Sequence, residues 1–206
     1  MANIITLIRF PLLFLYVGFL YMHNPTLQLW DVPFIILIIL LDTVDGVIAR
    51  ARGEVSLIGS VLDIATDRTL EIVLWVVFAH LGLIPIVIPL IVIARGTTVD
   101  AIRAVGMRSG VAAFDQVRAP ISRFLVSSKY MRSGYGFAKG IAFSLLTLDL
   151  GLLTKGSTWQ PTVHFIALTF TWIAITMTIA RGLPVLIEGY SLFKNPQPIT
   201  KNVNEE

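Results

Sequence analysis

Long, nearly uninterrupted runs of apolar residues restrict this chain to a narrow set of folds. A helix needs about 20 consecutive apolar residues to cross a bilayer, and several blocks of the sequence reach that length. Only 14% of the residues are charged, whereas a soluble domain usually carries about 25%. We therefore predict an all-α, polytopic integral membrane protein with six transmembrane helices, at residues 4–22, 32–50, 55–81, 84–108, 134–153 and 161–183.

The distribution of positive charge predicts the orientation in the membrane. Six crossings would put both termini on one side, together with the loops near residues 50–54 and 108–132. The opposite loops contain a single basic residue, Lys155. The basic residues of the first side are Arg50, Arg52, Arg108, Arg118, Arg123, Lys129, Arg132, Lys194 and Lys201. Because cytoplasmic loops are enriched in Lys and Arg, we expect both termini in the cytoplasm. Residues 1–194 form one membrane domain in this interpretation, and 195–206 a disordered cytoplasmic tail.

Four aspartates lie at the predicted cytoplasmic ends of the second and third segments. At helical spacing, one face of the second segment carries Asp42, Asp45, Gly46 and Ala49. One face of the third carries Ser56, Gly59, Asp63 and Asp67. Residues spaced by three or four share a helical face, and small residues let two such faces approach closely. We expect the four carboxylates to converge.

The chemistry of these side chains predicts a metal site. Four carboxylates in a low-dielectric setting need a compensating cation. The chain has no cysteine, and oxygen-only ligands favour a hard ion such as Mg²⁺, Mn²⁺ or Ca²⁺. Arg50, beside the cluster on the cytoplasmic side, indicates a pyrophosphate-bearing substrate.

The complete pattern resembles the signature of the CDP-alcohol phosphotransferase (CDP-alcohol phosphatidyltransferase) family. It reads D-x2-D-G-x2-A-R-x8-G-x3-D-x3-D from Asp42 to Asp67, with every fixed position filled. The six-helix layout is similar to that family over nearly the whole chain. The resemblance implies that Asp42, Asp45 and Asp63 bind metal, and that Asp67 is a further ligand and the general base. It also implies contacts to the CDP part from Gly46, Arg50, Ser56 and Thr6. Ala49 and Gly59 lack bulk, so we expect them to leave room for this ligand.

The reaction implied by this resemblance is transfer of a phosphatidyl group from CDP-diacylglycerol, or a similar CDP-lipid, with release of CMP. Two Mg²⁺ or Mn²⁺ ions would stabilise the departing CMP, while Asp67 removes a proton from the acceptor hydroxyl. The resemblance further implies a homodimer in contact with membrane lipids. We place the protein in the cytoplasmic (inner) membrane of a bacterium or archaeon and expect no nucleic-acid partner.

The acceptor alcohol is predicted from two cations inside otherwise apolar segments. Arg95 and Lys139 both need a polar partner there, which favours a phosphorylated acceptor. Together with Arg103, these residues form an arrangement loosely similar to phosphatidylglycerophosphate synthases, although Ala94-Arg95-Gly96 replaces their Ser-Arg-Glu. Their Gly-Lys-x-Lys-Thr pattern is also missing around Lys139. We expect glycerol 3-phosphate as the acceptor, with inositol phosphate or another alcohol as the alternative.

Other interpretations of the same residues stay open. The aspartates could form the transport site of a divalent-cation transporter, or belong to a catalytically silent scaffold. Arg68 could face solvent or pair with Glu71 at i+3. The three histidines, His23, His80 and His164, show no ligand spacing, so we expect them to be packed or interfacial. Arg9, inside the first segment, argues against a cleaved signal peptide.

Overall fold

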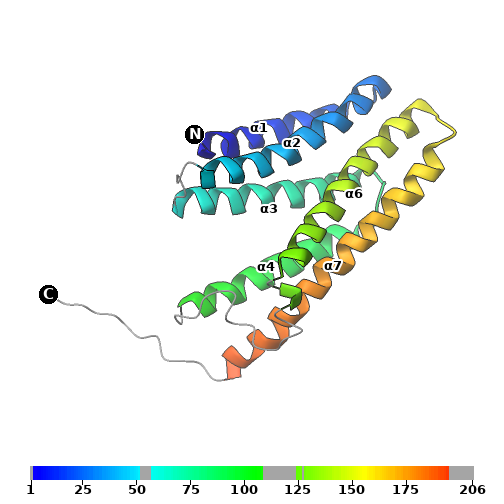
Figure 1. The fold of residues 1–206 in the computed structure, drawn as a ribbon. Helices are drawn as coiled ribbons and strands as arrows, with labels where there is room; N and C mark the ends of the chain where they lie inside the picture. Colours follow the sequence, from blue (N-terminus) through cyan, green and yellow to red (C-terminus); the bar gives the residue numbers. More distant parts are fainter. Residues whose placement is uncertain (1, 52–56, 109–123, 127, 195–206) are drawn as a thin grey trace. The chain divides into compact units, whose positions relative to one another are not determined.

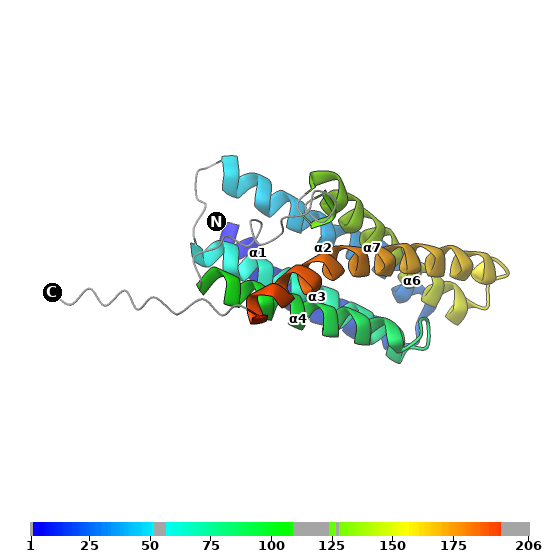
Figure 2. The ribbon, with the colours of Figure 1, turned by 90° about the horizontal axis from the view of Figure 1, so that it is seen from below.

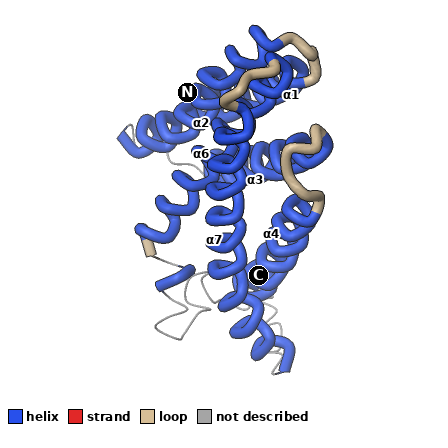
Figure 3. Tube along the Cα trace, turned by 90° about the vertical axis from the view of Figure 1, so that its right-hand side faces the viewer, coloured by secondary structure: helices blue, strands red, loops and turns tan. Residues whose placement is uncertain are grey.

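The protein is all-helical over the part of the chain that the structure, a computed structural model, describes. Residues 2–51, 57–108, 124–126 and 128–194 are described, and no strand occurs among them. The helices are α1 (Ala2–Leu20), α2 (Pro25–Ala51), α3 (Leu57–His80), α4 (Val87–Arg108), α6 (Lys129–Lys155) and α7 (Gln160–Lys194). Short turns connect most of these helices (Figures 1 and 3). The prediction of an all-α fold is confirmed.

Two of these helices are long and apolar enough to cross a membrane. The qualifying stretches are Tyr130–Lys155 in α6 and Gln160–Ile187 in α7. Shorter apolar stretches cover Thr6–Leu20 in α1 and Pro25–Leu41 in α2. These helices fit a membrane protein, while the six crossings and their orientation remain predictions.

The second helix begins earlier than the apolar pattern predicted. Its first residue is Pro25, whereas we expected a loop up to residue 31. The Asn24 side-chain oxygen accepts hydrogen bonds from the backbone N–H groups of Thr26 at 3.0 Å and Leu27 at 3.3 Å. An asparagine cap followed by proline at the first helical position starts a helix efficiently, so the helix follows the turn directly.

The last helix is longer than predicted and continues through Pro184 to Lys194. Proline removes one backbone hydrogen bond and usually ends or kinks a helix. Here the next residue, Val185, is buried in a cluster with Val99, Ile102 and Val126. This packing supports the helix beyond the residue at which we expected it to stop.

Two glycines make the predicted turns at the ends of α3 and α6. Gly82 has φ +76° and Gly156 has φ +69°, a left-handed conformation that glycine adopts without steric cost. The N–H of Leu83 bonds to the carbonyl of Phe78 at 3.0 Å, which closes the end of α3. The sequence signals for these two turns were correct.

The first of two compact units comprises Met1–Pro89 and Ala138–Trp172. Within it α1 lies against α2 and α3, and the three run side by side (Figure 1). The end of α6 and the start of α7 form a hairpin, seen from a second direction in Figure 2. Trp75 and Phe143 form the aromatic centre, with ring centroids 4.7 Å apart. A Cβ on Gly151 would lie 2.9 Å from Leu29, so α6 approaches α2 closely at that point.

The second unit comprises Leu90–Phe137 and Ile173–Glu206. Besides its valine-rich cluster, it contains two arginines packed against their neighbours. The Arg95 side chain lies against Gly182, where an added Cβ would be 2.7 Å from Cγ of the arginine. The Arg181 guanidinium lies 5.4 Å from the ring centre of Tyr135. The prediction of one membrane domain over residues 1–194 stays a prediction.

Candidate active site

Three carboxylates follow one another along a face of α3, at intervals of one helical turn. Asp63 and Asp67 are four residues apart, and Glu71 comes four residues later, which places them on neighbouring positions of one face. The Asp63 side chain is 52% exposed and that of Asp67 is 46% exposed, whereas Glu71 is 3% exposed. The two signature aspartates are therefore accessible, and the third carboxylate is buried.

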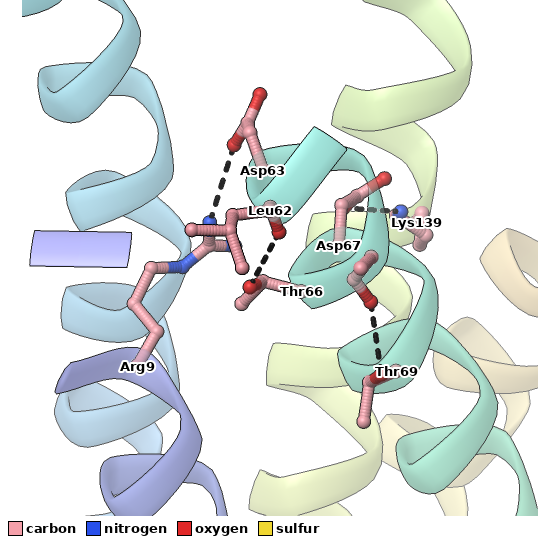
Figure 4. A network of polar contacts seen from close by, with 8 residues as sticks. Arg9, Leu62, Asp63, Thr66, Asp67, Thr69 and Lys139 are labelled. Atoms are coloured by element: carbon pink, nitrogen blue, oxygen red, sulfur yellow. Dashed lines mark hydrogen bonds and ion pairs between the residues drawn. The ribbon is translucent and has the colours of Figure 1, made fainter. Parts of the chain in front are cut away.

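Arg9 approaches the first of these carboxylates from α1. Its Nη1 atom lies 3.8 Å from Asp63 Oδ1 (Figure 4), and the arginine side chain is 1% exposed. A guanidinium is always charged in proteins, and a buried charge needs an opposite charge nearby. Asp63 supplies that charge from α3.

Lys139 approaches the other two carboxylates from α6. Its Nζ atom lies 3.4 Å from Asp67 Oδ1 and 3.6 Å from Glu71 Oε2, and the lysine side chain is 12% exposed. Figure 4 shows its contact with Asp67 on the side of α3 away from Arg9. Our prediction that Lys139 requires a polar partner is confirmed, and both contacts described above are with carboxylates.

The buried Glu71 has a second cation beside it. Arg68 Nη1 lies 3.6 Å from Glu71 Oε2, so of the two alternatives for Arg68 the i+3 pair forms. The polar network of α3 also includes Thr66, whose hydroxyl donates to the carbonyl of Leu62 at 2.8 Å. Such bonds to the preceding turn satisfy a buried hydroxyl inside a helix.

The remaining signature residues are described less completely. Asp42, Asp45, Gly46, Ala49 and Arg50 belong to the last turns of α2, but their side chains lie outside the described part of the structure. Ser56 lies outside the described residues altogether. The helical spacing that we assumed for residues 42–50 is present, and the convergence of all four aspartates remains a prediction.

The other predicted substrate-binding residues fall in two places. Thr6 is buried on α1, one turn before Arg9, and Gly59 is half-buried on α3. Both belong to the first unit, as does Lys139. Arg95 belongs to the second unit, on α4.

The donor atoms present fit the expected metal. The described carboxylates near the exposed face of α3 offer oxygen ligands, which suit Mg²⁺ or Mn²⁺. Among the side chains that the structure describes, no group of three or more His, Cys, Asp or Glu residues is gathered for a metal ion. The side chains of Asp42 and Asp45, the other two expected ligands, are not among them.

Two elements of the polar structure were not predicted. From the sequence we used Arg9 only against a signal peptide, although its spacing from Leu13 and Tyr16 marks it as part of a buried face. His164 was expected to be simply packed or interfacial. Its Nδ1 lies 2.7 Å from Asp149 Oδ2, and Gln160 Nε2 donates to Asp149 Oδ1 at 2.8 Å. Asp149 is fully buried, and these contacts stabilise its carboxylate.

Comparison with known protein families agrees with the signature and the helical fold. The family model described as CDP-alcohol phosphatidyltransferase matches residues 1–180. The chain therefore belongs to the CDP-alcohol phosphatidyltransferase family. Membership indicates a transferase that moves a phosphatidyl group from a CDP-alcohol to an acceptor, and enzymes of the family generally use divalent metal ions. A search of curated protein sequences finds no significant match.

Proposed function

We propose that this protein transfers a phosphatidyl group from CDP-diacylglycerol, or a similar CDP-lipid, to the hydroxyl of a small polar acceptor and releases CMP. The observation that supports this proposal is the pair Asp63 and Asp67, exposed one turn apart on α3 within a complete family signature. In the proposed site, Asp42, Asp45, Asp63 and Asp67 hold two Mg²⁺ or Mn²⁺ ions. Such ions, when bound, neutralise the pyrophosphate and the departing CMP.

Asp67 is the proposed general base. Its side chain is nearly half exposed, so an acceptor hydroxyl can approach it within hydrogen-bonding distance. In the reaction, the acceptor oxygen forms a bond to the β-phosphorus as its proton passes to Asp67. The bond between that phosphorus and the CMP oxygen breaks, and CMP leaves with the electron pair.

The CDP part is assigned to residues of α1, α2 and α3. Arg50 would pair with the pyrophosphate, and Gly46, Ala49 and Gly59 would leave space for the nucleotide. Thr6 is buried on α1 and Ser56 precedes α3, and both would contribute polar contacts. These assignments follow the signature and the spacing of the residues.

The cationic side chains of Lys139 and Arg95 favour a phosphorylated acceptor. Lys139 carries a nearly buried ammonium 3.4 Å from Asp67, and a charged phosphate beside the base would find an opposite charge there. Arg95 is the second proposed contact. We propose glycerol 3-phosphate as the acceptor, with inositol phosphate as the alternative.

The experiment is CMP release by purified protein with CDP-diacylglycerol and Mg²⁺ or Mn²⁺. The acceptor panel contains glycerol 3-phosphate, inositol phosphate, inositol, serine and glycerol. We expect release with one phosphorylated acceptor, and loss of turnover with retained CDP-lipid binding in Asp67→Asn. Asp100→Asn, at an exposed position of α4 outside the signature, is the matched control and should keep wild-type turnover.

Two results would contradict the proposal. Near-normal turnover in Asp67→Asn would remove Asp67 from the role of base. Absence of CMP release with every acceptor, together with Mn²⁺ uptake into liposomes, would favour a divalent-cation transporter.

The proposed location is the cytoplasmic membrane of a bacterium or archaeon, with six crossings and both termini in the cytoplasm. The apolar helices α6 and α7 support membrane insertion, and the distribution of basic residues supports the orientation. The donor lipid could then keep its acyl chains in the bilayer while its head group reaches the aspartates. We propose a homodimer on the resemblance to the family.

A further inference from the structure

One face of α1 is buried from Thr6 to Leu20. The residues of this face recur at intervals of three or four, as a helix packed on its neighbours requires. They are Thr6, Arg9, Leu13, Tyr16 and Leu20, each 3% exposed or less. Arg9 thus occupies a position at which an apolar side chain would pack against α2 and α3.

A guanidinium in that position is explained by its charge and not by its volume. Burying a charge is costly unless an opposite charge and hydrogen bonds offset the lost hydration. The guanidinium of Arg9 reaches Asp63, with Nη1 3.8 Å from Oδ1. A leucine would fill the same face of α1 without that cost.

Arg9 and Asp63 differ sharply in solvent exposure, and this difference shows from which side the arginine contacts the carboxylate. Arg9 is 1% exposed and Asp63 is 52% exposed. The arginine therefore contacts the carboxylate from the protein interior. Figure 4 shows the other carboxylate oxygen pointing away from the arginine.

We propose that Arg9 is a positioning residue for Asp63, holding the carboxylate in the orientation in which it binds the divalent ion. This inference rests on the proposed function, in which Asp63 is a metal ligand. Residues that contact a metal ligand without binding the metal themselves commonly fix the orientation of that ligand and raise the affinity for the metal. A guanidinium suits this role because its planar group offers fixed donor directions.

The test is direct binding of Mn²⁺ to the purified, substrate-free protein in detergent, followed by electron paramagnetic resonance. We expect Arg9→Gln to raise the Kd for Mn²⁺ by about 10- to 100-fold. Arg9→Lys keeps the charge but not the planar donor group, and we expect an increase of about fivefold.

The matched control is Tyr16→Phe. Tyr16 lies on the same buried face of α1, and its hydroxyl pairs with that of Thr147 at 2.5 Å. The substitution disturbs packing and hydrogen bonding of α1 away from Asp63. Its Kd for Mn²⁺ should stay within about twofold of wild type.

The outcomes separate this inference from the proposed function. A folded Arg9→Gln protein with an unchanged or lower Kd would overturn the positioning role. Where Arg9→Gln does not fold, an unchanged Kd in Arg9→Lys overturns it. Absence of Mn²⁺ binding in wild type, or undiminished binding in Asp63→Asn, would instead refute the metal centre of the proposed function.

Discussion

The ion pairs of Lys139 permit a quantitative prediction. Lys139→Met removes the ammonium and keeps a side chain of similar length. Glu71, 3% exposed, then loses its contact with Lys139, while Arg68 stays 3.6 Å away. Removing one partner of a buried pair costs about 3–5 kcal/mol. Because Arg68 still contacts Glu71 and Asp67 is nearly half exposed, we expect a loss of about 2 kcal/mol in the free energy of unfolding.

The assay is a double-mutant cycle on unfolding in detergent micelles. Glu71→Gln alone should destabilise the protein by about 1–2 kcal/mol, since Lys139 loses the contact with this carboxylate and keeps the one with Asp67. The double variant removes both charges, so its loss should be smaller than the sum of the two single losses by about 1–2 kcal/mol. The KM for the acceptor, measured on the same proteins, should rise in Lys139→Met while the KM for the CDP-lipid changes little.

Lys155→Met provides the control for this cycle. It makes the same substitution on the same helix, at an exposed position in the last turn of α6. We expect a change within about 0.5 kcal/mol. Strictly additive losses in Lys139→Met and Glu71→Gln would refute the coupling between these side chains. An unchanged acceptor KM would remove Lys139 from the acceptor site.

Two further predictions test the packing and the orientation. Gly151→Ala places a methyl group 2.9 Å from Leu29 Cδ2 and 3.3 Å from its backbone nitrogen, so we expect a loss of about 1–3 kcal/mol and a lower thermal unfolding midpoint. Gly136→Ala, on the same helix with nothing within 4 Å of the added carbon, should be neutral or stabilising, and equal midpoints for the two variants would contradict the close approach. Because the chain has no cysteine, single cysteines report sidedness directly. A membrane-impermeant maleimide added to intact cells should label Thr158→Cys and not Asn204→Cys, and the reverse pattern would invert the proposed topology.

The helices could be predicted from the sequence because their signals are local. Apolar runs and punctuating glycines such as Gly82 and Gly156 indicate where helices end. The predicted start of α2 was wrong because the prediction placed Asn24 and Pro25 in a loop. In the structure Asn24 caps the helix that begins at Pro25.

The site could be predicted only in part, because periodicity reports the face of a helix and not its neighbours. The four-residue spacing of Asp63 and Asp67 was sufficient to place them one turn apart. Lys139 was recognised as a cation in need of a partner, yet Asp67 lies 72 positions away in the sequence. Arg9 and Asp63 are similarly distant, and the contact depends on how α1 packs against α3.

The two ion pairs on α3 have a mechanical consequence. Asp63 is held by Arg9 of α1, and Asp67, one turn along, is held by Lys139 of α6. A one-residue slip of α3 would shift these carboxylates by about 1.5 Å along the axis and turn them by about 100°, which would break both contacts together. The contacts from α1 and α6 thus oppose rotation of α3 about its axis at the level of the two aspartates. A rotation of α3 at this turn would therefore cost both ion pairs at once.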